Sequence, residues 1–193
     1  MIDFNYFHLF PGIVILAMIL IILRKQKRNF WYLFFFSGFW IYLLFAFSVI
    51  VFPIAPLSKN DGFRLSLNLI PFYFGTCEMP ELCIRNIVDN ILLTVPFGLG
   101  ISFITSLRWK DFIWLAPLVR LVFEGLQLII ALLFRSPFRV VDINDVILNT
   151  LGVWVGYILF RTFGFFYLFV TKRLPIRHIS LFAYLHEVVR QTQ

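Results

Sequence analysis

Apolar residues are grouped along the chain in runs that are long enough to cross a membrane. The first two runs cover about Phe7 to Leu23 and about Phe30 to Phe52. Three more cover about Asn86 to Leu107, Phe112 to Phe134 and Val140 to Arg161. Because a transmembrane helix needs about 20 mainly apolar residues, the pattern predicts an all-α polytopic membrane protein with about five transmembrane helices.

The segments between and after these runs carry turn signals or amphipathic patterns. A long loop from about Pro53 to Arg85 contains PIAP, KNDG and CEMPE. After the fifth run, FGFFYLFV either lengthens that helix or turns along the inner surface. The C-terminal ISLFAYLHEVVRQTQ predicts an amphipathic helix on the inner leaflet, with a frayed tail as the alternative. We find no internal repeat, so residues 1–193 are interpreted as a single transmembrane domain.

Composition supports the membrane interpretation. Hydrophobic residues make up 61% of the 193 residues and charged residues 14%, whereas charged residues make up about 25% of a typical soluble domain. The net charge of +7 comes from basic residues beside the hydrophobic runs and not from a compact basic patch. This distribution is typical of membrane topology, so we expect no nucleic-acid partner.

The basic residues also predict the orientation. With the N-terminus outside, ten lie inside, namely Arg24, Lys25, Lys27, Arg28, Arg108, Lys110, Lys172, Arg173, Arg177 and Arg190. Five lie outside, namely Lys59, Arg64, Arg85, Arg135 and Arg139. Because Lys and Arg are enriched in cytoplasmic segments, we expect the N-terminus outside and the C-terminus inside. No basic segment precedes the first run, which we interpret as an uncleaved anchor.

Three of the predicted spans carry polar residues at helical spacing. The third has Asn86, Asn90 and Thr94, the fourth has Arg120, Glu124 and Gln127, and the fifth has Asp142, Asp145 and Asn149. A charged side chain at the centre of a span costs about 2.5–3.5 kcal/mol on insertion scales, so such residues should face other helices or water. The predicted topology brings all three stripes between the middle of the membrane and its outer surface. We therefore predict a polar chamber that opens to the outside.

Each polar residue also has a purely structural interpretation. Arg120 and Glu124 are four residues apart and could neutralise each other within one helix. Asparagine and glutamine often hold transmembrane helices together, and Asp145 could cap a helix start. Gly152 and Gly156 share the face of the acids and would let a neighbouring helix approach closely. Three coincident stripes with three carboxylates favour a functional pocket over structural bonds alone.

Four motifs resemble those of the VanZ-like family, bacterial membrane proteins named after a teicoplanin-resistance protein. They are NLIPF from Asn68, NILLTVPFG from Asn90, EGLQ from Glu124, and RVVDINDVILNTLGVWVG from Arg139. They occur in the family's order within about residues 68–160. The family positions correspond to Asn90, Pro96, Gly98, Glu124, Gln127, Arg139, Asp142, Asp145, Asn149, Gly152 and Gly156. Thr94 departs from a commonly apolar position, and Asn144 from one that is often acidic.

The resemblance implies a multi-pass protein of the bacterial cell membrane that contributes to resistance against teicoplanin-type lipoglycopeptides. In our first hypothesis, the outward polar site binds a lipid headgroup, a cell-wall precursor or the antibiotic itself. Arginines on the outer side could hold phosphate or carboxylate groups. The predicted ligand-binding residues are Asn90, Arg120, Glu124, Gln127, Arg139, Asp142, Asp145 and Asn149.

The second hypothesis is an intramembrane enzyme that acts on a lipid-linked diphosphate. Glu124 would be the general acid or base. Asp142 and Asp145 would hold Mg²⁺, which prefers oxygen ligands. Under the first hypothesis we expect no cofactor and no metal. The sequence leaves open whether the protein is an enzyme.

Other chemistry is poorly supported by the sequence. Cys77 and Cys83 lie in the loop that we place outside, where they could form a disulfide. Their spacing without a nearby histidine is not typical of a zinc site. The three histidines fall on different segments, and there is no phosphate-binding glycine motif, so nucleotide hydrolysis is not predicted.

Overall fold

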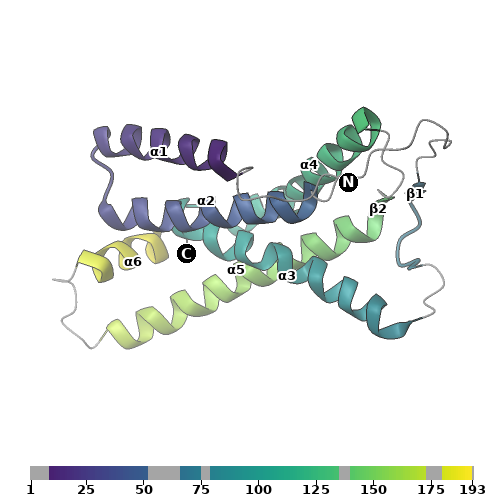
Figure 1. The fold of residues 1–193 in the computed structure, drawn as a ribbon. Coiled ribbons are helices and arrows are strands. Elements are labelled where there is room, and N and C mark those ends of the chain that lie inside the picture. Colours follow the sequence, from purple (N-terminus) through teal and green to yellow (C-terminus); the bar gives the residue numbers. More distant parts are fainter. Residues whose placement is uncertain (1–8, 52–65, 75–78, 135–139, 173–179, 193) are drawn as a thin grey trace.

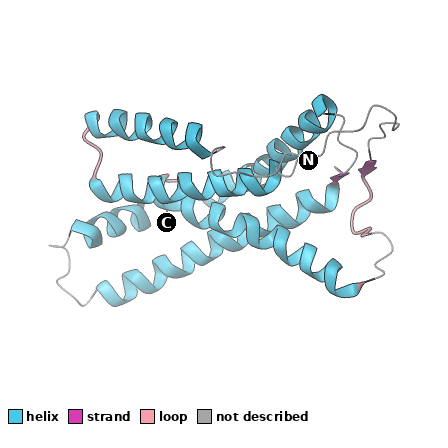
Figure 2. Cartoon of the chain, viewed as in Figure 1, coloured by secondary structure: helices cyan, strands magenta, loops and turns pink. Residues whose placement is uncertain are grey.

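The computed structural model describes residues 9–51, 66–74, 79–134, 140–172 and 180–192. Figures 1 and 2 show long helices with two short strands at one end. The helices are α1 (Phe10–Lys25), α2 (Phe30–Val51), α3 (Pro80–Ile104), α4 (Trp109–Phe134), α5 (Ile143–Thr171) and α6 (Ser180–Gln191). The strands are β1 (Ser66–Asn68) and β2 (Val140–Asp142). The predicted all-α class is confirmed.

Four of the described helices are long and apolar enough to cross a membrane. They are α2, α3, α5 and the part of α4 from Trp109 to Ile130. The described part of α1 has 16 residues, or about 24 Å at a rise of about 1.5 Å per residue. That is shorter than the hydrocarbon core of about 30 Å. The predicted number of about five spans is thus approximate, with four supported by length and composition.

Several helix bounds differ from the sequence prediction. α3 begins at Pro80, earlier than expected, because proline is well suited to the first turn of a helix. α5 has 29 residues and continues to Thr171, so the apolar FGFFYLFV lengthens the fifth span and does not turn along the surface. At about 44 Å, α5 exceeds the hydrocarbon thickness, and Figure 1 shows it crossing α3 obliquely.

The crossing of α3 and α5 is the most extensive contact in the fold. It depends on Gly98 of α3 and on Gly152 and Gly156 of α5, because a side chain at any of them would collide with the backbone of the opposite helix. Small residues at such positions let the backbones of membrane helices approach closely. Beside this crossing, a cluster of buried apolar residues joins α3, α4 and α5, namely Phe97, Phe112, Ala116, Val153 and Tyr157.

The helices have two ends of different character. At the strand end, β1 and β2 form a parallel pair with Asn68 beside Asp142. At the opposite end, which we call the α6 end, lie the α1–α2 turn, the α3–α4 turn and α6 (Figure 1). The described basic residues of this end include Arg24, Lys25, Lys27, Arg28, Arg108, Lys110, Lys172 and Arg190. The positive-inside rule predicts that the α6 end faces the cytoplasm.

The predicted C-terminal amphipathic helix is confirmed as α6. Its buried residues are Tyr184, Leu185 and Val189, and Val189 packs beside Gly164 of α5. The Tyr184 hydroxyl donates to the Phe103 carbonyl at 2.6 Å. Burial raises the pKa of Tyr184 to about 12, so this hydroxyl keeps its proton at neutral pH. α6 is therefore docked on the ends of α3 and α5.

The glycine contact leads to a first prediction. Gly156→Leu would place a side chain against the backbone of Val95 and Leu99, and overpacking typically costs about 1–3 kcal/mol or more. We expect this variant to unfold at a clearly lower temperature, measured by thermal denaturation of the protein in detergent. Gly38→Leu is the matched control because a Cβ atom at Gly38 would have no neighbouring atom within 4 Å. Equal melting temperatures for the two variants would contradict the proposed role of the crossing.

Candidate functional site

A buried arginine joins two carboxylates from two helices near the strand end. Nη2 of Arg120 forms ion pairs with Glu124, one turn further along α4, and with Oδ2 of Asp145 on α5 at 3.0 Å. The side chains of Arg120, Glu124 and Asp145 are 3%, 6% and 22% exposed. A charge in a low-dielectric interior needs a partner. The predicted pairing within α4 is therefore present, and Asp145 extends it to a second helix.

Amide side chains continue this arrangement towards α3. Nδ2 of Asn90 donates to Oδ1 of Asp145 at 3.0 Å, and Nδ2 of Asn149 donates to Oδ1 of Asn90 at 3.0 Å. The Thr94 hydroxyl donates to the Asn149 carbonyl at 2.7 Å. We refer to Asn90, Arg120, Glu124, Asp145 and Asn149 as the polar cluster. It joins α3, α4 and α5 through side chains that the sequence predicted to face each other.

Some atoms of the polar cluster are buried without a hydrogen-bond partner among the described residues. Apart from Oε1 of Glu124, which forms the ion pair with Arg120, they are Oε2 of Glu124, Oδ1 of Asn149 and Nε of Arg120. Leaving such an atom unpaired typically costs about 1–3 kcal/mol, so a buried polar atom normally finds a partner. Two of the three are acceptors, and the cluster carries two carboxylates for one guanidinium. The cluster can therefore accept hydrogen bonds from an additional donor.

Asp142 organises the segment above the polar cluster. It is the N-cap of α5, and its Oδ1 accepts from the backbone N–H of Asn144 at 2.8 Å. The cap of this helix is therefore Asp142 and not Asp145, whose side chain faces Arg120. Nδ2 of Asn68 donates to both oxygens of Asp142, at 3.0 and 3.1 Å. This bond ties β1 to the start of α5.

A turn that follows β1 is fastened to the same helix start by Asn144. The backbone N–H of Phe72 donates to Oδ1 of Asn144 at 2.6 Å, and Nδ2 of Asn144 donates to the Tyr73 carbonyl at 2.8 Å. Asn144 is 2% exposed. We did not predict Asn68 or Asn144 as site residues. The NLIPF motif could have pointed to Asn68, and the presence of an asparagine at a commonly acidic family position could have pointed to Asn144.

A known protein family matches the part of the chain that contains these residues. A family model described as VanZ/LLP1 matches residues 39–170. The chain belongs to the VanZ/LLP1 family. The match includes most of α2 and nearly all of α5, and so extends beyond residues 68–160, where we found the resemblance. With its four apolar helices of spanning length, this VanZ/LLP1 chain is a membrane protein. No curated protein and no solved structure shows significant similarity to it.

The remaining predicted site residues of the VanZ/LLP1 chain are placed apart from the polar cluster or lie outside the described residues. Nε2 of Gln127 donates to the Ile50 carbonyl of α2 at 3.3 Å, so Gln127 holds two helices together. Arg139 and Cys77 lie outside the described residues. The Cys77–Cys83 disulfide therefore stays a prediction.

The donor set of the polar cluster does not fit Mg²⁺. Arg120 already supplies a positive charge to Glu124 and Asp145, and Asp142 is occupied by Asn68 and by its own helix start. A guanidinium and a divalent cation would compete for the same oxygens. No step of a mechanism is therefore assigned to Mg²⁺.

The ion pairs lead to a second prediction. Arg120→Gln would leave the buried Glu124 carboxylate and the partly buried Asp145 carboxylate without their cation, and removing one partner of a buried pair typically costs about 3–5 kcal/mol. We expect a large fall in melting temperature in detergent, and partial recovery when Glu124→Gln and Asp145→Asn are added. The control is Arg85→Gln, which breaks an exposed pair with Asp89 at 3.5 Å and should have little effect. A triple variant that melts no higher than Arg120→Gln would argue against charge as the cause.

Proposed function

We propose that this VanZ/LLP1 protein is a multi-pass protein of the bacterial cell membrane that lowers susceptibility to teicoplanin-type lipoglycopeptides. In this proposal the polar cluster binds the headgroup of a membrane-anchored amphiphile, which is a lipid, a cell-wall precursor or the antibiotic itself. The observation that carries the proposal is the convergence of three helices on buried, partly unpaired polar atoms.

The distribution of charge supports an outward site. The helix ends and turns that carry most of the described basic residues lie at the α6 end, and the positive-inside rule places such an end in the cytoplasm. The strand end, and the polar cluster near it, would then lie towards the outer surface. Cell-wall precursors after their export, and antibiotics that act on them, are reached from that side.

The unpaired atoms indicate the chemistry of the headgroup. Oε2 of Glu124 and Oδ1 of Asn149 are acceptors without donors. A hydroxyl or ammonium group would supply the missing donors, and an ammonium group would also offset the second carboxylate. Sugars and amines are therefore better suited to the polar cluster than a phosphate. Any contact to a phosphate would have to come from other residues, such as the predicted Arg64, Arg135 and Arg139.

The turn after β1 supports an amphiphilic ligand. Leu69, Ile70, Phe72 and Tyr73 are 66%, 63%, 74% and 54% exposed, although Asn144 bonds Phe72 and Tyr73 to the start of α5. Phe72 has a φ of 63°, which is uncommon for a bulky residue and marks a position worth a functional explanation. An apolar surface next to a polar cluster suits a molecule with a hydrocarbon chain and a polar headgroup.

The resistance proposal leads to a third prediction. A susceptible Gram-positive host that expresses the protein should tolerate more teicoplanin, while its vancomycin tolerance should change little. Asp145→Asn removes the charge that joins Arg120 to Asn90, so we expect it to abolish the gain. The measurement is the minimum inhibitory concentration of each antibiotic at equal membrane levels of the protein.

Asp89→Asn is the matched control for that experiment. It removes the same charge from an exposed side chain on α3, outside the polar cluster, and should protect as well as the parent. If Asp145→Asn also protects fully while it is present in the membrane at parental levels, the polar cluster is not the site. If the parent gives no gain in tolerance, the resistance proposal fails.

A fourth prediction distinguishes the enzyme hypothesis from the binding proposal. The unpaired Glu124 oxygen is the one observation that favours it, because a general acid or base needs a free position. Since Arg120 competes with a metal, we expect purified protein to release no phosphate from lipid diphosphates, with or without Mg²⁺. Phosphate release that Glu124→Gln abolishes, measured colorimetrically, would instead establish the enzyme.

A further inference from the structure

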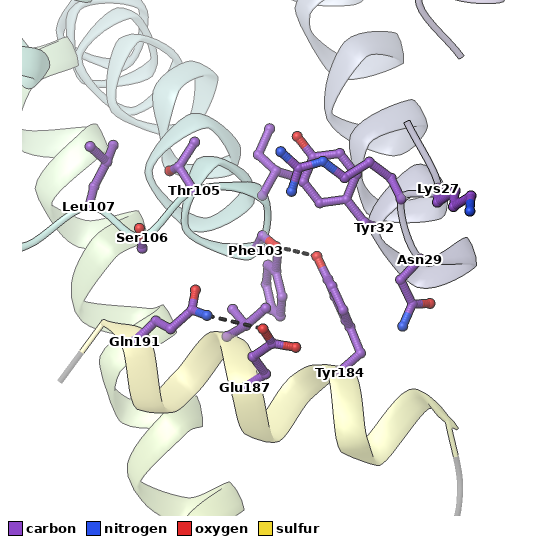
Figure 3. A pocket seen from close by; sticks show the side chains of 13 residues that line it. Lys27, Asn29, Tyr32, Phe103, Thr105, Ser106, Leu107, Tyr184, Glu187 and Gln191 are labelled. Carbon is purple, nitrogen blue, oxygen red and sulfur yellow. Dashed lines mark hydrogen bonds between the residues drawn. The ribbon is translucent and has the colours of Figure 1, made fainter. Parts of the chain in front are cut away.

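A cavity of about 620 Å³ lies at the α6 end, and none of its lining residues belongs to the polar cluster; Figure 3 shows the cavity from close by. It is partly open and is bounded by the turn between α1 and α2, the turn between α3 and α4, and one side of α6. Its volume is within the range of about 300–1,000 Å³ that is usual for small-molecule sites. Neither the polar cluster nor the proposed resistance function uses it.

The wall of the cavity from the α1–α2 turn is basic. Lys27 and Arg28 both line it, and the Arg28 guanidinium lies over the Tyr32 ring, 5.1 Å from its centroid. Such stacking restricts a guanidinium without using its hydrogen-bond donors. The next helix, α2, begins here, with Oδ1 of Asn29 accepting from the Trp31 N–H at 3.0 Å. The start of a helix adds partial positive charge.

Lys27 has a backbone conformation that normally selects glycine. Its φ is 59°, and it follows the end of α1 in a turn closed by two bonds. The Lys27 N–H donates to the Arg24 carbonyl at 3.0 Å, and the Arg28 N–H donates to the Leu23 carbonyl at 3.2 Å. This is the Schellman arrangement, in which glycine is the usual residue because it has no Cβ. Lys27 therefore occupies a position where glycine is usual, and it brings a positive charge to the lining of the cavity.

The other walls combine one acid and several uncharged polar side chains, among them Thr105 and Ser106, with apolar side chains. Glu187 of α6 accepts from Nε2 of Gln191 at 3.1 Å, as Figure 3 shows. The charged residues that line the cavity are thus Lys27, Arg28 and Glu187, with a net charge of +1. Phe103, Ile104, Leu107 and Val188 supply apolar surface. A free phosphate ion would gain nothing from this apolar part.

From these observations we propose that the cavity binds the phosphate headgroup of an anionic phospholipid from the leaflet at the α6 end. Arg28 and Lys27 contact the phosphate, and the apolar wall contacts the start of the acyl chains. The location agrees with the chemistry, because α6 is an amphipathic helix docked beside the ends of the spans. Basic residues at the cytoplasmic surface attract anionic lipids.

The experiment is native mass spectrometry of the full chain in a nonionic detergent with added phosphatidylglycerol or phosphatidylcholine. We expect phosphatidylglycerol to bind more tightly. Arg28→Gln should weaken its binding about fivefold, which corresponds to about 1 kcal/mol. Lys25→Gln is the matched control, since it removes one positive charge from the same turn region but does not line the cavity. It should leave the affinity unchanged.

The variant Lys27→Gly tests whether lipid binding can be weakened without a loss of stability. Glycine suits the φ of 59°, so this variant should melt at the same temperature as the parent or higher, and still bind phosphatidylglycerol more weakly. The proposal is overturned if both lipids bind equally, or if Lys25→Gln weakens binding as much as Arg28→Gln. It is also overturned if glycerol phosphate displaces the lipid at an equal concentration, because the ligand would then be a soluble phosphate.

Discussion

The packing of the helices depends on the pairing of one buried charge, that of the Arg120 guanidinium. Arg120 lies in the middle of an apolar helix, and its guanidinium has a partner on its own helix and another on α5. Since an unpaired buried charge is far more costly than a paired one, α4 and α5 are held in the register that brings Arg120 to Asp145. Asn90 and Asn149 extend the same constraint to α3.

The glycine crossing and the polar cluster reinforce each other. Gly152 and Gly156 let α5 lie directly on α3, and Asn149 is one turn from Gly152 on the same side of α5. Backbone contact at the glycines thus brings the Asn149 and Asn90 amides within hydrogen-bond distance. A larger residue at either glycine would separate the helices and break the amide contacts as well as the packing.

The two ends of the molecule differ in the chemistry that they present. Near the strand end, buried acceptors without donors suit hydroxyl and ammonium groups, whereas the cavity at the α6 end has two cations and one acid in its lining and is proposed to bind a phosphate. Both are next to apolar surface, so both proposals concern amphiphiles. The two sites are built by different residues.

The sequence by itself determined the helical class, the polar faces of α3, α4 and α5, and the amphipathic α6, because helical spacing and hydropathy are local properties. It also indicated the VanZ/LLP1 family through motifs around Asn90, Glu124 and Asp145. Only the tertiary structure decided that Asp142 caps α5 while Asp145 binds Arg120, that Gln127 faces α2, and that Asn68 and Asn144 fasten the turn after β1. These outcomes depend on contacts between residues far apart in the chain, and spacing along one helix carries no information about which neighbour a side chain meets.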